Sequence, residues 1–257
     1  MERISEKKRY HLLDSLRGLT LISMILYHGT WDLVYLYGVD WQWYHGTLAY
    51  IWQQSICWTF ILLSGFCWSM GRHHLKRGLM VFGGGAIITL VTLIAMPDNR
   101  VVFGVLTLLG SCMLLMIPLH KLLEKINPWL GLVCSGILFT VTRDVNIGFL
   151  GFEGWKLMKL PRELYHNLVS TFFGFPESAF FSTDYFSLVP WMFLFLVGYF
   201  LFQGLRKMDV LEKNEMTQKV LGWKVPVLSF IGRHSLIIYM AHQAVLYVIL
   251  QTVFQQW

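Results

Sequence analysis

The sequence predicts an all-α protein, a polytopic bundle of about seven to eight transmembrane helices with a structured extracytoplasmic loop. Hydrophobic residues make up 55% of the 257 positions and charged residues only 14%, whereas soluble domains contain about 25% charged residues. Aromatic residues reach 16%, with 11 Trp, which is typical of the belts at membrane interfaces. A soluble chain of this length could not bury so much apolar surface, so we expect most of it to lie in a bilayer.

Seven segments are apolar enough to be spanning helices, which need about 20 such residues each. They cover residues 12–35, 47–70, 79–96, 101–119, 129–143, 187–204 and 227–254. Two of them, 101–119 and 129–143, are short, which favours a tilted helix or a locally thin bilayer. The last is long enough to begin as an interfacial turn. We expect residues 1–257 to form one transmembrane domain.

The basic residues predict the orientation, because cytoplasmic loops carry an excess of Lys and Arg. With the N-terminus in the cytoplasm, 16 of the 21 basic residues lie on the inner side and 5 on the outer side. The outer five are Arg100, Arg143, Lys156, Lys159 and Arg162. We therefore expect a multi-pass protein of the plasma (inner) membrane, with the N-terminus cytoplasmic and the bilayer as its first partner.

The longest connection, residues 144–186, is expected on the outer side. Loops this long in compact domains are often functional. The stretch from Pro161 to Phe173 is predicted to form a short amphipathic helix on the membrane surface. Two interpretations fit the loop equally well: a lid over a cavity, or a packed cap without chemistry.

Several classes of site are not indicated. The four cysteines fall inside predicted spans and suggest buried thiols, with neither a disulfide framework nor a metal site. The net charge of +6 comes from short loops between apolar runs and does not indicate a nucleic-acid partner. Gly83, Gly84 and Gly85 lie within a span, where close helix packing explains them better than phosphate binding.

The first span carries ionisable residues. His28 precedes Asp32 by four residues, so the two share one helix face. Ionisable groups at membrane depth cost about 2.5–3.5 kcal/mol each and usually serve a function. We expect Asp32 to accept the Nδ1 proton of His28 and leave Nε2 as a base. The structural alternative is that His28 merely bonds a carbonyl of a neighbouring helix.

Two further histidines extend this candidate catalytic set. His45 precedes the second span in DWQWYHG, and His242 lies in YMAHQ of the last span. Together with His28 they are predicted to line one aqueous vestibule. For His45 the alternative is an amphipathic anchor in a Trp- and Tyr-rich interface.

A second candidate set lies at the cytoplasmic end of the bundle. Asp14 and Arg17 are three residues apart, and Arg233 and His234 belong to FIGRHSL. The positive charge there suits the phosphates of a nucleotide-like donor. A local ion pair, and arginines that extend to the interface, explain the same residues without a ligand.

Five segments in order resemble the heparan-α-glucosaminide N-acetyltransferase-like membrane proteins, over about residues 10–250. The segments are LDSLRGLTLISMILYH with WDL, FILLSGFCWSM, VFGVLTLLGSCMLL, GFPESAFFSTDYFSLVPWMFLFLVGYFLFQG and FIGRHSLIIYMAHQAVLY. The ten-residue spacing between Arg17 and His28 also resembles the wider class of membrane acyltransferases that modify sugars.

The resemblance implies a polytopic enzyme that takes acetyl from cytoplasmic acetyl-CoA and delivers it to an amino sugar or sugar hydroxyl across the membrane. No metal is implied. In the lysosomal relative the matching catalytic histidine is His45, whereas in the wider class it is His28. We favour His28, because Asp32 is expected to orient it. A cell-envelope saccharide is a more plausible acceptor than heparan.

The acceptor is expected to enter under the 144–186 loop, where Asp184, Tyr185 and Trp191 are the candidate contacts. Arg17, Asp14, Arg233 and His234 are the candidate residues for the donor. Two other classes of function stay open: a proton-coupled small-molecule transporter and a non-catalytic membrane scaffold. The oligomeric state is open as well.

Overall fold

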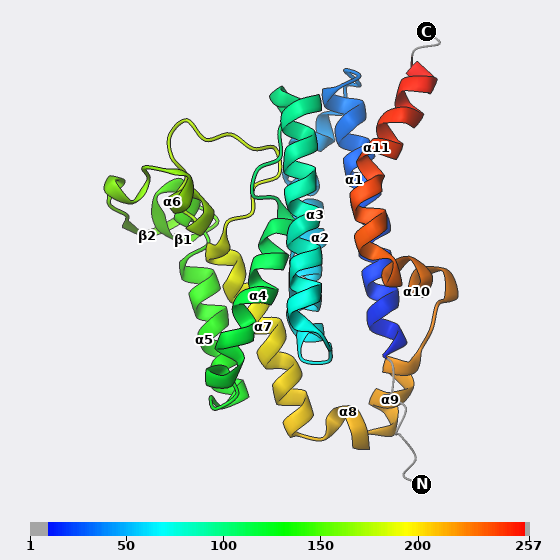
Figure 1. The fold of residues 1–257 in the computed structure, drawn as a ribbon, viewed down its shortest axis with the longest axis vertical. Helices are drawn as coiled ribbons and strands as arrows, with labels where there is room; N and C mark the ends of the chain where they lie inside the picture. The colour runs from blue at the N-terminus through cyan, green and yellow to red at the C-terminus, as the bar shows by residue number, and fades with distance from the viewer. Residues whose placement is uncertain (1–9, 255–257) are drawn as a thin grey trace. The chain divides into compact units, whose positions relative to one another are not determined.

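The computed structural model describes residues 10–254, and these are predominantly helical (Figure 1). The helices are α1 (His11–Tyr35), α2 (Thr47–Trp68), α3 (His74–Ala95), α4 (Val105–Leu123), α5 (Pro128–Val141), α6 (Leu168–Phe173), α7 (Leu188–Lys207), α8 (Val210–Lys213), α9 (Glu215–Gly222), α10 (Pro226–Arg233) and α11 (Ser235–Phe254). Short 3₁₀ turns occur at Gln42–His45, Pro97–Asn99, Val145–Ile147 and Arg162–Leu164. The prediction of a helical bundle is confirmed.

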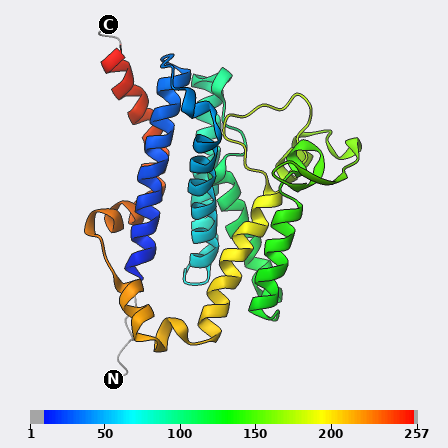
Figure 2. The same cartoon turned by 180° about the vertical axis from the view of Figure 1, so that it is seen from behind.

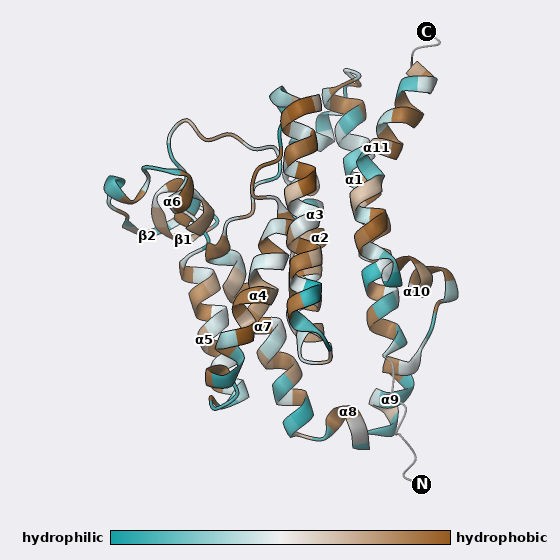
Figure 3. Cartoon of the chain, in the orientation of Figure 1, coloured by the Kyte–Doolittle hydropathy of each residue, from teal (hydrophilic) through white to brown (hydrophobic). Residues whose placement is uncertain are grey.

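Four of the described helices are long and apolar enough to cross a membrane: α3, α4, α7 and α11. They support a membrane protein, whereas seven or eight spans are not confirmed. Helix α1 has 25 residues and α2 has 22, so both are long enough. Their apolar runs are interrupted by polar residues, Asp32 in α1 and the pair Gln53 and Gln54 in α2. Figure 3 colours the helices by the hydropathy of each residue.

Four of the 16 basic residues assigned to the inner side, Arg3, Lys7, Lys8 and Arg9, lie outside the described residues. The orientation of the chain stays a prediction.

The described chain divides into two compact units. The first contains residues up to 60 and from 206 onward, and therefore α1, most of α2 and α8 to α11. The second contains residues 61–205, and therefore the end of α2, α3 to α6 and nearly all of α7, with a short β-hairpin.

Glycines bring α1 and α10 into backbone contact in the first unit. A Cβ atom on Gly18 would lie 2.0 Å from the carbonyl oxygen of Leu228, and one on Gly232 would lie 1.8 Å from that of Asp14. Ser15 and Ser229 complete this contact with a hydrogen bond of 2.7 Å between their hydroxyls, both of which are buried. Small residues of this kind let two helices approach within a membrane.

Glycines bring helices into backbone contact at two places in the second unit, between α2 and α7 and between α3 and α4. Gly65 of α2 and Gly198 of α7 lie against backbone carbonyls of the facing helix, which a Cβ atom on each glycine would approach to 1.9 and 2.2 Å. A Cβ atom on Gly85 of α3 would lie 2.6 Å from the amide nitrogen of Thr107 in α4. The prediction that the glycines at 83–85 serve packing is confirmed for Gly85, while Gly83 has open space beside it.

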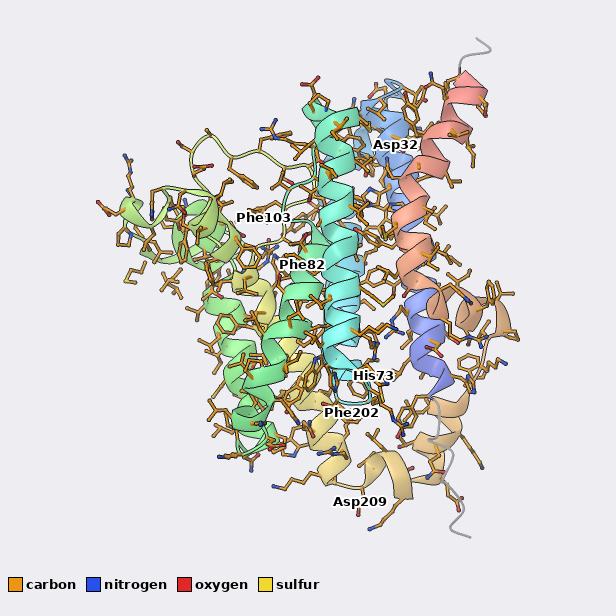
Figure 4. The ribbon with its side chains drawn as sticks, viewed as in Figure 1. Asp32, His73, Phe82, Phe103, Phe202 and Asp209 are labelled. Atoms are coloured by element: carbon orange, nitrogen blue, oxygen red, sulfur yellow. The ribbon has the colours of Figure 1, made fainter. Side chains whose placement is uncertain are left out.

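Three predicted spans have different limits. The span expected at 79–96 begins at His74, five residues earlier. The span expected at 101–119 begins at Val105, because Phe103 has a positive φ of 56° and breaks the helix before Gly104 (Figure 4). The segment 227–254 is divided into α10 and α11 at His234. Its first part does form a separate short helix.

The 144–186 segment differs most from expectation. It contains the antiparallel strands β1 (Phe149–Phe152) and β2 (Trp155–Lys159), which the all-α prediction did not include. The helix expected from Pro161 to Phe173 is wrong: only α6 is α-helical. Asn167 starts α6 with a capping box. Its side chain accepts a hydrogen bond from the backbone N–H of Ser170, and the Ser170 hydroxyl accepts one from the backbone N–H of Asn167.

The close contact between α1 and α10 predicts a strong effect of one methyl group. Gly18→Ala places Cβ on the Leu228 carbonyl, so we expect destabilisation of about 1–3 kcal/mol or more, as overpacked sites show. Gly83→Ala is the matched control, because a Cβ there meets nothing within 4 Å and Ala favours a helix over Gly. Thermal unfolding in detergent should show a lower midpoint for Gly18→Ala only. Equal midpoints would contradict the contact.

Candidate active site

Two histidines from different helices meet in the first unit. His28 lies on α1 and His242 on α11, and their ring centroids are 5.1 Å apart with an interplanar angle of 54°. Asp32 is one turn beyond His28 on the same face of α1 and is fully buried, with 0% exposure (Figure 4). The contact between α1 and α11 therefore brings the residues expected on these two helices to one place.

Asp32 bonds Gln243 and not His28. Its Oδ1 accepts a hydrogen bond of 2.7 Å from Nε2 of Gln243, and its Oδ2 has no partner among the described residues. The expected hydrogen bond from His28 to Asp32 is thus not formed. The reason is tertiary: the amide of Gln243 on α11 reaches the carboxylate across the helix contact.

His242 has its tautomer fixed by the backbone. Its Nδ1 faces the carbonyl oxygen of Tyr239, one turn back on α11. Since a carbonyl only accepts, Nδ1 carries the proton in this contact. The neutral ring then has its lone pair on Nε2, which is buried and has no partner within the described residues. His242 therefore has the properties that were expected of His28.

Three hydrogen-bond acceptors are left unsatisfied at this contact. They are Oδ2 of Asp32, Oε1 of Gln243 and Nε2 of His242, all of them buried. Such atoms cost about 1–3 kcal/mol each when nothing bonds them. When Asp32 is ionised all three accept, so the arrangement fits a ligand that brings N–H or O–H donors.

Aromatic side chains surround the histidine pair. The ring of Tyr27 lies 5.9 Å from that of His28, 5.4 Å from Tyr44 and 5.2 Å from Trp52. Trp52 donates from Nε1 to the Ser23 hydroxyl at 2.8 Å, which fixes its orientation. Tyr44 lies outside the spans, and burial raises the pKa of its hydroxyl above its ordinary value.

A comparison with protein families matches residues 9–244 to a family described as heparan-alpha-glucosaminide N-acetyltransferase, catalytic. The match covers most of the chain. The chain belongs to this N-acetyltransferase family. Comparisons with curated proteins and with solved structures give no significant match.

His45, the alternative catalytic histidine expected from the sequence, follows the C-terminal end of α1, which is the end that carries His28 and Asp32. It ends the 3₁₀ turn Gln42–His45, is exposed, and has Nδ1 at 3.2 Å from the hydroxyl of Tyr35. The ring of Tyr35 also lies 6.2 Å from that of Tyr44. His45 is therefore linked to the aromatic surroundings of His28 through Tyr35.

The expected donor-binding residues come together at the other end of α1. Arg17 pairs with Asp14 at 3.5 Å, and Nε of Arg233 donates to the Ser229 carbonyl at 3.1 Å. Nδ1 of His234 lies 2.9 Å from the Phe230 carbonyl. The backbone contact of Asp14 with Gly232 joins these two sets. Along α1, at 1.5 Å per residue, Asp14 lies about 21 Å and Arg17 about 16–17 Å from His28.

The three expected acceptor contacts of this N-acetyltransferase family member lie in the second unit. Oδ2 of Asp184 is 3.4 Å from the backbone nitrogen of Val105, and the Tyr185 hydroxyl donates to the Thr171 carbonyl at 2.5 Å. Trp191 is buried beneath Arg143, whose guanidinium lies 4.9 Å from the indole ring. Burial raises the pKa of Asp184 to about 6 and that of Tyr185 to about 12.

The sequence analysis missed Gln243, Tyr27 and Tyr44. A signal existed for Gln243, since an amide next to His242 in an apolar span is as unusual as the histidine itself. Tyr27 and Tyr44 had none, because tyrosine is common at interfaces.

Within the described residues, no group of three or more His, Cys, Asp or Glu side chains could hold a metal ion. None of the four cysteines forms a disulfide within the described residues.

The bond between Gln243 and Asp32 predicts an unequal pair of variants. Gln243→Met leaves the buried carboxyl of Asp32 with no partner, so we expect a loss of about 1–3 kcal/mol. The double variant Asp32→Leu, Gln243→Met removes both polar groups and should recover part of that loss. Thermal unfolding of the two single variants and the double variant measures the coupling. Additive losses would mean that the two side chains do not interact.

The raised pKa of Asp184 predicts a pH dependence. The folded protein binds this proton more tightly than the unfolded chain, whose carboxyl has a pKa of about 3.9. Stability from this group is therefore greatest below about pH 4 and is lost as the pH rises to about 6. Asp184→Asn should remove this dependence, by at most about 3 kcal/mol at 1.36 kcal/mol per pH unit. Parallel stability curves of both proteins between these pH values would refute the expectation.

Proposed function

We propose that this protein is a transmembrane acetyltransferase that moves acetyl from cytoplasmic acetyl-CoA to an amino sugar or sugar hydroxyl of an extracytoplasmic saccharide. The observation that carries the proposal is the pair of imidazoles, 5.1 Å apart, beside the bonded Asp32 and Gln243. Residues 1–257 act as one acyltransferase domain in the plasma (inner) membrane, with the N-terminus cytoplasmic.

His242 is the general base in this proposal, with His28 beside it. The contact of His242 Nδ1 with the Tyr239 carbonyl supports this assignment, because it leaves Nε2 ready to accept a proton. His28 keeps a catalytic role, since its ring faces that of His242. His45 is the alternative base, in line with the lysosomal relative, and reaches the same aromatic cluster through Tyr35.

The acceptor's nucleophile is held by the unsatisfied acceptors. Oδ2 of Asp32 and Oε1 of Gln243 have lone pairs that can accept hydrogen bonds from N–H or O–H donors. An amine brings more donors than a hydroxyl, so an amino sugar fits this set better. Asp32 thus changes role: it binds and orients the acceptor and does not orient His28.

The transfer is an acyl substitution. The nitrogen or oxygen of the acceptor attacks the thioester carbonyl carbon, and its proton passes to Nε2 of the histidine. The carbon–sulfur bond then breaks, and the sulfur leaves with the electron pair and takes up a proton. Transfer through an acetyl-histidine intermediate is the other course that these residues allow.

The donor's phosphates are assigned to Arg17 and Arg233. Each uses part of its guanidinium within the protein, Arg17 with Asp14 and Arg233 with Ser229. The remaining N–H groups suit phosphate oxygens. Asp14 holds Arg17 in place, and His234 is the further candidate contact at this end of α1, with its Nδ1 donating to the Phe230 carbonyl. The distance of about 16–17 Å from Arg17 to His28 along α1 would be bridged by the extended arm of the donor.

The 144–186 segment is proposed as the entry for the acceptor. Asp184, Tyr185 and Trp191 are its candidate contacts there; Asp184 and Tyr185 are partly exposed and Trp191 is buried. An oligomer is compatible with the proposal, and no nucleic acid or metal takes part.

Single histidine variants test the proposal. The assay measures transfer of labelled acetyl from acetyl-CoA to an amino sugar by the purified protein in proteoliposomes. We expect His242→Ala to lower the transfer rate about 10²- to 10⁴-fold, which is the usual contribution of a general base. His28→Ala should lose activity as well. His45→Ala should keep activity if His242 is the base, and should lose it if His45 is the base. His166→Ala is the matched control, because His166 is exposed in the second unit.

Wild-type rates in both His242→Ala and His28→Ala would remove the imidazole pair from the mechanism. Proton-driven uptake of a solute without release of CoA would instead support the carrier hypothesis. No acetyl-CoA-dependent thermal shift in the wild type would favour the scaffold.

A further inference from the structure

The hairpin β1–β2 in the second unit exposes an apolar strand. All five residues of β2 are exposed, including Trp155 at 83%, Leu157 at 69% and Met158 at 56%. Lys156 and Lys159 are the other two residues of the strand. A strand that faced water on a two-stranded sheet would gain nothing from three such residues.

The hairpin is locked to the end of α5. The carboxylate of Asp144 accepts hydrogen bonds from the backbone N–H groups of Glu153, at 3.1 Å, and Gly154, at 2.8 Å, which form the hairpin turn. Nε of Arg143 pairs with the Glu153 carboxylate at 3.0 Å. A parallel bridge between Thr142 and Gly151 adds a third link. The position of the hairpin is therefore set by α5 (Figure 2).

Helix α5 is itself apolar and short. Leu130, Val133 and Ile137 are 58%, 53% and 57% exposed, and their spacing of three and four residues makes one outward stripe. Its 14 residues extend about 21 Å, at 1.5 Å per residue, whereas the hydrocarbon core of a bilayer is about 30 Å thick. A helix of this length that contacts lipid throughout ends inside the hydrocarbon core and does not reach its far boundary.

We propose that the β1–β2 hairpin is an interfacial anchor that continues the lipid contact of α5. Trp155, Leu157 and Met158 enter the boundary between headgroups and acyl chains, while Lys159 extends toward lipid phosphates and the ammonium of Lys156 lies over the ring of Phe149. Tryptophan prefers this depth, and lysine places its stem along apolar surface while its ammonium reaches the headgroups. The occupant of this face is the bilayer surface on the side where α5 ends.

The chemistry of β2 favours lipid over a sugar. Leu157 and Met158 offer no hydrogen bond, and the Nζ of Lys156 lies 4.3 Å from the ring of Phe149. A saccharide site needs several convergent polar groups. The anchor also rests on contacts of the second unit alone, so it is independent of the proposed acyl transfer.

Photo-crosslinking in proteoliposomes tests the anchor. A p-benzoylphenylalanine replaces Leu157 in one variant and Ser178, an exposed residue of the same segment, in the matched control. We expect a phospholipid adduct, seen by mass spectrometry of the intact protein, severalfold more abundant at 157 than at 178. The adduct at 157 should increase in long-chain compared with short-chain phosphatidylcholine, because a thicker core covers more of the hairpin.

Three outcomes would overturn the proposal: no lipid adduct at 157, equal adducts at both positions, or a crosslinked protein dimer at 157 in place of the lipid adduct. The last would assign the face to a second copy of the chain.

Discussion

The hydrogen bond between Asp32 and Gln243 sets the geometry on which the candidate site depends. A carboxylate with 0% exposure is costly unless a partner faces it, and its partner here comes from a different helix. The 2.7 Å bond fixes the register of α11 against α1. Because His242 directly precedes Gln243 and His28 is one turn before Asp32, the same register brings the two imidazoles together.

Backbone contacts at glycines make that register possible. Gly18 and Gly232 let α10 lie directly on α1. The helix breaks at His234, and α11 then runs along α1 in the same direction, from His28 toward Tyr37. One helix contact therefore carries cations at one end and imidazoles at the other. This separation agrees with a reaction in which donor and acceptor come from opposite sides of a membrane.

The sequence predicts the helices well and their partners poorly. Helices α1, α2 and α7 begin and end within two or three residues of their predicted limits, since long apolar runs leave few alternatives. His28 and Asp32 were recognised because ionisable residues are rare in spans. The pairing of Asp32 with Gln243 was beyond reach, because spacing within one helix says nothing about which other helix faces it. The hairpin at 149–159 was missed for a related reason: its short strands are stabilised by Asp144, which bonds the turn from outside.

Three buried hydrogen-bond acceptors lie at the contact of α1 with α11. Oδ2 of Asp32, Oε1 of Gln243 and Nε2 of His242 are buried without partners in the part of the chain that the structure describes. Three leucines in their place would stabilise the α1–α11 contact, since apolar groups carry no desolvation cost. A fold that keeps three acceptors together at that cost gains something else from them. In the proposed reaction, their lone pairs are the groups of this contact that can accept the N–H donors of an amine.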